Sequence, residues 1–199
     1  MEDRRTEGLY LELIDGPVDW YLKTRVAEVL GNPVVTRATW WRNEQRDRAD
    51  LPRVLDEFDH LAVYETTRGF VPPDLLDERV RGLHFLATPR PGQGIITGRP
   101  TIGLSLVLIS PRTDSDEQTL RDWGDFVHIR HIAEVAVPGY AMITPYINAT
   151  ECAHPRFMHF YEMDCDEPER AFQAMTPLVT QRIGQPDTVA WKRWATTPS

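Results

Sequence analysis

Cysteine is scarce in this 199-residue sequence, which contains only Cys152 and Cys165. Two thiols cannot form a four-cysteine zinc site, and a disulfide framework uses a much higher density of cysteine. We therefore expect both residues to be ordinary thiols and assign no metal to them.

Long apolar runs and basic clusters are also absent from the sequence. No segment approaches the roughly 18 consecutive apolar residues of a membrane span, and no apolar signal-peptide core follows the charged start of the chain. Acidic residues outnumber basic ones by 30 to 22, which gives a formal net charge of −8. Because nucleic acids and anionic membranes bind basic surfaces, we expect neither as a partner, and we expect a cytoplasmic protein.

The remaining composition is typical of a folded chain. Hydrophobic residues make up 41% of the sequence and charged residues 26%, which fits one or two small globular domains. Residues 89–100 are rich in proline and glycine, as linkers and surface loops often are. This segment predicts a boundary between two domains, residues 1–98 and residues 99–199.

Apolar patterning and chain breakers predict a similar order of elements in both halves. The first half is expected to contain a strand at 8–14, a helix at 18–30, strands at 34–41 and 60–66, and a helix at 73–82. The second half is expected to contain strands at 102–110, 140–147, 157–163 and 188–194, and helices at 115–136 and 168–183. Each half then approximates a β-α-β-β-α-β unit of the ferredoxin-like type.

Matching residues indicate that one half duplicates the other. The same spacing relates Ala27-Glu28-Val29 to Ala133-Glu134-Val135 and Trp40 to Tyr146. Strands such as residues 103–110 are apolar at successive positions, which predicts that both sheet faces are covered. Helices can cover only one face, so the other is expected to pack on the second sheet. The predicted fold class is α+β, with tandem ferredoxin-like units packed sheet to sheet as an intrachain α/β barrel.

Two segments of the second half, residues 122–146 and 155–175, resemble a known family. The matching motifs are His131-Ile132-Ala133-Glu134-Val135 in a helix, Val137-Pro138-Gly139 in the turn that follows, and Tyr161-Glu162 in a later strand. They are similar to motifs of the dimeric α/β-barrel superfamily, in particular its EthD-like and antibiotic-biosynthesis-monooxygenase-like branches. Ala133 stands where proline is usual, and His128 rather than His131 has the usual distance from Trp123. The resemblance implies a ferredoxin-like fold and small-molecule chemistry, which ranges over cofactor-free oxygenation, polyketide cyclisation, lyase steps and haem chemistry.

His128 and His131 are the first candidates for acid/base catalysis. They lie three positions apart on the second long helix, so their side chains occupy adjacent turns. At about 100° per residue, His128 falls at the rim of the apolar face that includes Phe126, and His131 falls nearly opposite that face. An imidazole has an unperturbed pKa near 6.5 and can exchange a proton at neutral pH. The matching positions of the first half, Leu22 and Arg25, carry no imidazole, so we expect one site, in the second half, with the first half as scaffold.

Alternation along residues 157–163 places His159 and Tyr161 on one face of a strand. A tyrosine hydroxyl beside an imidazole can orient it or stabilise an oxyanion, although a core tyrosine bonded to the backbone is the alternative. The candidate catalytic residues are therefore His128, His131, His159 and Tyr161. Large side chains that suit a flat substrate, or an ordinary core, supply the candidate substrate-binding residues Trp40, Trp123, Tyr140, Met142, Tyr146 and Phe157. Of these, Tyr140, Met142 and Tyr146 are expected on a common face of their strand.

These residues favour a cofactor-independent enzyme that acts on a small apolar, aromatic or polyketide-like substrate by histidine acid/base chemistry. The step would be an oxygenation, a cyclisation or a lyase reaction. The alternative is a noncatalytic, stress-related module that binds a ligand, most specifically haem, because a helical histidine can ligate iron. A catalytic metal held by the histidines and a Cys152 nucleophile are weaker alternatives. The sequence leaves the oligomeric state open, with a homodimer as one alternative.

Overall fold

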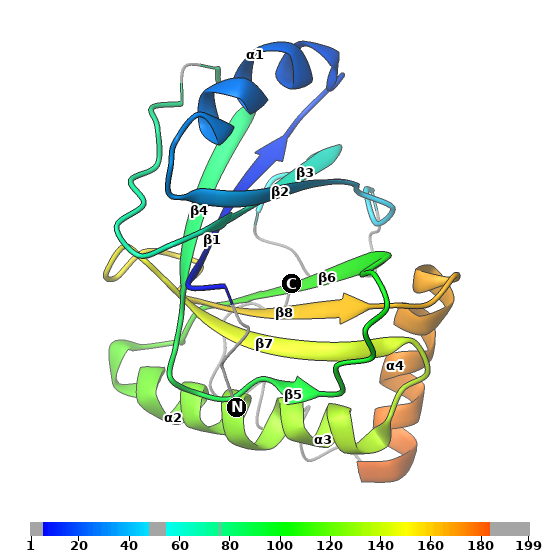
Figure 1. Cartoon of the computed structure of the whole chain (residues 1–199). Helices are drawn as coiled ribbons and strands as arrows, with labels where there is room; N and C mark the ends of the chain where they lie inside the picture. Colours follow the sequence, from blue (N-terminus) through cyan, green and yellow to red (C-terminus); the bar gives the residue numbers. More distant parts are fainter. Residues whose placement is uncertain (1–5, 48–54, 76, 184–199) are drawn as a thin grey trace. The chain divides into compact units, whose positions relative to one another are not determined.

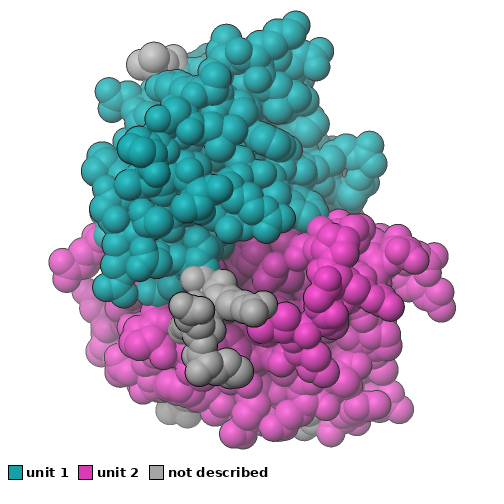
Figure 2. Space-filling model, viewed as in Figure 1, with its two compact units in different colours: residues 1–87, 148–150 teal, residues 88–147, 151–199 magenta. Residues whose placement is uncertain are grey.

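The computed structural model describes residues 6–47, 55–75 and 77–183. The chain divides into two compact units, shown in different colours in Figure 2: unit 1 comprises residues 1–87 and 148–150, and unit 2 comprises residues 88–147 and 151–199. Helices and antiparallel strands make up both units, so the fold class is α+β, as predicted. The domain assignment at residue 98, with its scaffold and site-bearing roles, stays a prediction.

Among its described residues, unit 1 contains one long helix and four strands (Figure 1). The elements are β1 (Gly8–Ile14), α1 (Asp19–Leu30), β2 (Val35–Arg42), β3 (His60–Thr66) and β4 (Val80–Ala87). The strand order is β2-β3-β1-β4, and each neighbouring pair is antiparallel. Asp19 opens α1, where a negative charge is favourable to the helix dipole.

Unit 2 places its helices on one side of its strands (Figure 1). The strands are β5 (Gln93–Gly94), β6 (Gly103–Ile109), β7 (Tyr140–Asn148) and β8 (Phe157–Met163), in the order β5-β7-β8-β6. The helical elements are η1 (Asp114–Asp116), α2 (Glu117–Trp123), the π-helical turn η2 (Gly124–His128), α3 (Ile129–Val135) and α4 (Pro168–Ile183). No helix among the described residues is long and apolar enough to cross a membrane.

The two units share part of their strand order. In unit 1, β2 pairs with β3 and β3 with β1, and in unit 2, β7 pairs with β8 and β8 with β6. Each order places the first long strand of the unit next to the third. A duplicated unit would have this arrangement, and the duplication itself stays a prediction. The expected strand at residues 188–194 lies outside the described part of the chain.

Two expectations about the fold are wrong. The helix predicted at 73–82 is not formed: the chain is irregular at 70–75, and strand β4 begins at Val80 and pairs with β1. The carbonyls of Pro73 and Asp74 accept hydrogen bonds from Arg25 rather than from a helical turn. The predicted closed barrel is also absent from the described strands, because the sheet ends in open edges.

The core of each unit includes the layer between its sheet and its helices. All seven residues of β1 are buried, so both faces of this strand are covered. In β6, for which two covered faces were predicted, residues 104–107 are only partly buried. In unit 1 the helix-side cluster contains Tyr10, Tyr21 and Tyr64 among aliphatic residues. In unit 2 it contains Ile129, Ile132 and Tyr161. Buried polar residues lie beside these layers as well: Glu12 and Arg25 in unit 1, and Asp125 and His159 in unit 2.

Candidate functional site

The helical stretch from α2 to α3 is interrupted by the π-helical turn at Gly124–His128. π-helical turns are rare in proteins, but those that occur are often found at functional sites. The extra residue in the turn changes the direction of the side chains around it. Here the turn buries Asp125, which is 4% exposed, and leaves Phe126 44% exposed. The expected apolar helix face, which included Phe126, is therefore wrong at this point.

Asp125 is paired with a histidine on strand β8. Its Oδ1 atom lies 2.9 Å from Nε2 of His159, and both side chains are buried. Because a carboxylate accepts hydrogen bonds, the Nε2–H group of His159 donates a hydrogen bond to Oδ1 of Asp125. The Nδ1 atom of His159 is buried and has no hydrogen-bond partner among the residues that the structure describes. This tautomer leaves Nδ1 as the basic atom of the ring.

Two arginines flank the same carboxylate. Oδ2 of Asp125 lies 3.3 Å from a terminal nitrogen of Arg90 and 3.7 Å from Nε of Arg121. Arg90 also binds Asp122, at 2.6 Å. Burial and the nearby charge of Arg90 lower the pKa of Arg121, although the charge of Asp125 opposes this shift. The carboxylate of Asp125 thus lies between guanidinium groups and an imidazole.

His128, at the end of the π turn, belongs to an aromatic group beside this pair. Its ring centre lies 4.9 Å from that of Trp123, and the ring planes are inclined by 25°. The ring centre of His159 lies 6.4 Å from that of His128, at an inclination of 23°. His128 and Trp123 are partly exposed, whereas His159 is buried. The fold therefore brings three predicted site residues together, and His128 and Trp123 form the part that solvent reaches.

Gly124 allows the π turn to pass close to His159. A Cβ atom at this position would lie 3.1 Å from Cε1 of His159, closer than an ordinary contact between carbon atoms. A larger side chain would push the imidazole away from Asp125. The absence of a side chain at Gly124 thus helps to position the His159–Asp125 pair.

This arrangement can hold and exchange protons. Asp125 orients the imidazole of His159 through the hydrogen bond at Nε2. His128 is the partly exposed imidazole of the group and is suited to general acid/base work on a molecule that reaches it. Among the described residues, no group of three or more His, Cys, Asp or Glu is arranged to hold a metal ion.

Three other candidates lie on the same side of the sheet as His159. Phe157 packs in a small core cluster with Trp123. Tyr161 is buried and meets Tyr140 edge-on, with ring centres 5.8 Å apart. Burial raises the pKa of Tyr140, and its buried hydroxyl has no hydrogen-bond partner within the described chain. These rings extend the aromatic layer along β7 and β8.

Met142 and Tyr146 do not share a face with Tyr140, so this expectation is wrong. An irregularity in the pairing of β7 with β8 places Tyr140 opposite Met163 but Met142 opposite Glu162. Successive residues of a strand point to opposite faces. The irregularity therefore reverses the side chains that follow Tyr140 along β7.

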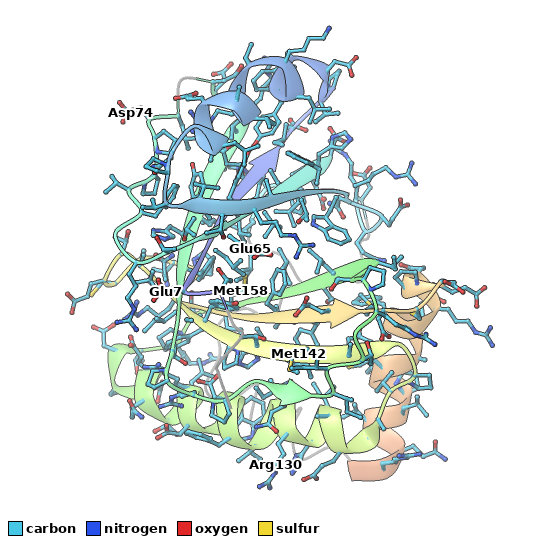
Figure 3. All side chains as sticks on the ribbon, in the orientation of Figure 1. Glu7, Glu65, Asp74, Arg130, Met142 and Met158 are labelled. Atoms are coloured by element: carbon cyan, nitrogen blue, oxygen red, sulfur yellow. The ribbon has the colours of Figure 1, made fainter. Side chains whose placement is uncertain are left out.

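Met142 and Tyr146 consequently lie on the face opposite to that of His159. Tyr146 meets Phe160 there edge-on, with ring centres 6.3 Å apart. Figure 3 labels Met142 on β7 and Met158 on β8 among the described side chains. The two predicted substrate-binding residues are thus separated from the histidine group by the sheet.

Trp40 and His131 occupy other parts of the fold. Trp40 lies on β2 in unit 1 and is 43% exposed. His131 lies on α3, beyond the π turn, and is partly buried. Of the two histidines predicted on the long helix, His128 is the one that stacks on Trp123.

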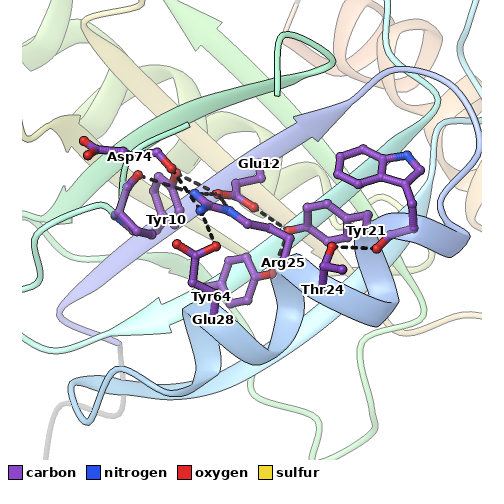
Figure 4. Close-up of polar contacts among 10 residues, drawn as sticks. Tyr10, Glu12, Tyr21, Thr24, Arg25, Glu28, Tyr64 and Asp74 are labelled. Atoms are coloured by element: carbon purple, nitrogen blue, oxygen red, sulfur yellow. Dashed lines mark hydrogen bonds and ion pairs between the residues drawn. The ribbon is translucent and has the colours of Figure 1, made fainter. Parts of the chain in front are cut away.

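A second buried polar group, which the sequence analysis missed, lies in unit 1 and is drawn in Figure 4. Glu12 is 0% exposed and accepts hydrogen bonds from the hydroxyls of Tyr10, at 2.8 Å, and Tyr21, at 2.5 Å. Arg25 donates to the same carboxylate from Nε at 3.0 Å and from a terminal nitrogen at 2.7 Å. The hydroxyls of Tyr21 and Tyr64 lie 2.6 Å apart.

Arg25 joins this network to the irregular segment at 70–75. Besides Glu12 it binds Glu28, at 2.8 Å, and the backbone carbonyl of Asp74, at 3.0 Å. Burial disfavours its charge, but hydrogen bonds to Glu12 and Glu28 raise the pKa of Arg25 overall. Both charged groups are therefore satisfied inside the unit, and we interpret the network as a structural connection between β1, α1 and this segment.

Comparison with known proteins gives a likeness of fold. The chain is similar to the crystal structure of an anthrone oxidase-like protein, with a TM-score of 0.54 and 10% sequence identity, over 98% of this chain and 89% of that one. No protein-family model matches the chain, and no curated protein matches it. At this level of identity the likeness shows a shared α+β fold. It does not test the EthD-like branch that the sequence motifs suggest.

Proposed function

We propose that the chain is a small-molecule enzyme that acts on a flat aromatic substrate, with His128 as its acid/base. The observation that carries this proposal is that His128 stacks on Trp123, with ring centres 4.9 Å apart. This stack lies beside the buried His159–Asp125 pair. The indole offers a surface for a conjugated ring, and the imidazole offers a proton acceptor at its edge. The motifs of the EthD-like and antibiotic-biosynthesis-monooxygenase-like branches support the same chemistry.

His159 and Asp125 act behind His128 in this proposal. Both are buried, so a substrate meets His128 first. The ring centre of His159 lies 6.4 Å from that of His128, and Asp125 fixes the orientation of the His159 ring. Arg90 and Arg121 in turn form ion pairs with the carboxylate of Asp125. His159 and Asp125 are therefore positioning residues, and no cofactor is part of the proposed chemistry.

An anthrone is the probe suggested by the similar structure, whose protein is named anthrone oxidase-like. In the proposed step His128 takes a proton from the ring carbon opposite the carbonyl, which leaves an electron-rich aromatic anion. O₂ then oxidises this anion: one oxygen atom becomes the new carbonyl oxygen, and the other leaves as water with the two hydrogens lost from that carbon. Anthrone and O₂ thus give anthraquinone and water, without a further reductant.

The experiment follows the conversion of dithranol to its anthraquinone by absorbance, with O₂ consumption measured in parallel. Wild-type protein is compared with His128→Gln and with the control His154→Gln, which changes an exposed histidine of the same unit. We expect the rate to fall by about 10²- to 10⁴-fold in His128→Gln and to stay unchanged in the control. A folded His128→Gln protein with full activity would contradict the role of His128.

The noncatalytic alternative makes a different prediction. A ligand-binding module would bind dithranol without consuming O₂, and the wild-type protein would then oxidise it no faster than buffer does. A haem-binding module would show a Soret absorption band after purification or after addition of haem. Either result would remove the enzymatic proposal in favour of binding.

A further inference from the structure

Arg121, on α2, carries a guanidinium without a hydrogen-bond acceptor in the part of the chain that the structure describes. Its side chain is 19% exposed, its Nε atom is buried without a hydrogen bond, and its ion pair with Asp125 is long, at 3.7 Å. A largely buried cation is unfavourable unless it is paired and hydrogen-bonded. The weak pairing of Arg121 therefore calls for an explanation.

The carboxylates nearest Arg121 have shorter contacts with other groups. Asp125 binds His159 at 2.9 Å. Glu117 binds Arg156 at 3.2 Å. The positive charge of Arg121 is thus the least compensated in this cluster, and the charge of Arg156 adds to the positive potential around it.

Arg121 also lies next to the aromatic part of the candidate site. Its Cζ atom lies 5.9 Å from the centre of the Phe157 ring, and Phe157 packs with Trp123. Trp123 in turn stacks with His128. An anion bound at Arg121 would therefore lie on the Phe157 side of the aromatic group that includes Trp123 and His128.

We propose that the substrate of this site is an aromatic acid whose carboxylate binds Arg121. The planar guanidinium fork matches the two oxygens of a carboxylate. The neighbouring Asp125, Asp122 and Glu117 would repel a doubly charged phosphate more strongly, which favours a single negative charge. The inference rests on the proposed function for the place of the ring, and it adds the anionic group that fixes the orientation of the substrate.

The test measures binding rather than turnover, so its failure is distinguishable from failure of the His128 chemistry. The probes are the fluorescent pair 9-anthracenecarboxylate and 9-anthracenemethanol, which differ in charge at the same ring position. They are titrated into wild-type protein, Arg121→Gln, Arg121→Lys and the control Arg130→Gln. Arg130 lies on α3, half exposed, and pairs with Glu134 on the surface.

We expect the carboxylate to bind wild-type protein more tightly than the alcohol does. Arg121→Gln should weaken binding of the carboxylate by about 10- to 100-fold and leave binding of the alcohol unchanged. The control Arg130→Gln should bind both probes as wild-type protein does. Arg121→Lys keeps the positive charge but not the guanidinium fork, so it should lose less affinity for the carboxylate than Arg121→Gln does. It replaces Arg121→Gln in the test if that variant does not fold. Equal wild-type affinity for the two probes, or an equal loss for both in a folded Arg121 variant, would overturn the proposal.

Discussion

The Nε2 atom of His159 on β8 lies 2.9 Å from Oδ1 of Asp125 in the π turn, although the residues are 34 positions apart in the sequence. Two local features make this contact. The π turn directs Asp125 into the unit, and the alternation of β8 directs His159 to the same side of the sheet. The contact therefore reports on both the helix geometry and the strand register.

Replacement of Asp125 by Asn should reduce both stability and activity. The amide keeps the size of the side chain but removes the charge that Arg90 and His159 share, and we expect a loss of about 1–3 kcal/mol in the free energy of unfolding. Urea denaturation measures this loss, and the dithranol assay measures the rate. Asp122→Asn is the matched control, because Asp122 also binds Arg90 but is half exposed. Equal stability of the two variants would contradict the structural importance of the buried pair.

Replacement of Gly124 by Ala should disturb His159 directly. The new Cβ would lie 3.1 Å from Cε1 of His159, so the imidazole must move, and we expect a destabilisation of about 1–3 kcal/mol. The same change in a His159→Ala background should cost much less, because the contacted ring is gone. Thermal or urea unfolding of the four proteins in this cycle gives the coupling. Additive effects would show that Gly124 and His159 are not in contact.

Most of the secondary structure could be predicted from the sequence. The predicted strands at 8–14, 60–66 and 157–163 coincide with β1, β3 and β8, because their apolar, β-branched and aromatic patterns are strong local signals. The error at 73–82 has a nonlocal cause. Arg25, far away in the sequence, binds the carbonyls of this segment, and β1 offers a free edge to β4.

The site could be predicted only in part. The histidines and Trp123 are visible as residue types, but the burial of Asp125 depends on the π turn. The signal for this turn is the spacing of two buried residues, Leu120 and Ile129. At about 100° per residue they would lie on opposite helix faces, yet both pack towards the sheet through Phe157 and Tyr161. One extra residue in the helix resolves this conflict.

The buried polar network of unit 1 could have been predicted from charged residues at apolar positions of the sequence. Glu12 stands in the middle of an otherwise apolar strand and, by alternation, on the same face as Tyr10. Arg25 stands four residues after Tyr21, on the same side of α1. A carboxylate and a guanidinium on the inner faces of adjacent elements indicate a buried ion pair, because either charge alone would be too unfavourable.

Removal of one partner of that ion pair should destabilise unit 1 strongly. Glu12→Gln leaves Arg25 buried without its carboxylate, and we expect a loss of about 3–5 kcal/mol in the free energy of unfolding. The double variant Glu12→Gln, Arg25→Met should lose less than the two single changes combined. Glu28→Gln is the control, since it removes a half-exposed partner of Arg25 and should cost less than about 1 kcal/mol. A Glu12→Gln protein as stable as this control would refute the importance of the buried pair.

The tyrosines around Glu12 predict a loss of stability in alkali. Burial and the charge of Glu12 raise the pKa values of Tyr10 and Tyr21, and burial raises that of Tyr64. The unfolded chain releases each phenolic proton near pH 10, whereas the folded chain retains it, so the unfolded state binds fewer protons above that pH. Each tyrosine should then lower the free energy of unfolding by about 1.4 kcal/mol per pH unit above pH 10, with no such effect below it.

Urea denaturation between pH 8 and pH 11 measures this slope, and tyrosinate absorbance measures ionisation in the same samples. Because the folded network excludes the phenolate forms, ionisation of its tyrosines should accompany unfolding rather than precede it. Tyr21→Phe removes one phenolic proton, so the fall in the free energy of unfolding per pH unit should be smaller by the contribution of one tyrosine. The variant is also less stable at neutral pH, because the hydrogen bond to Glu12 is lost. A native protein whose tyrosines all ionise near pH 10 without unfolding would show that the hydroxyls of Tyr10, Tyr21 and Tyr64 are not held in the neutral form.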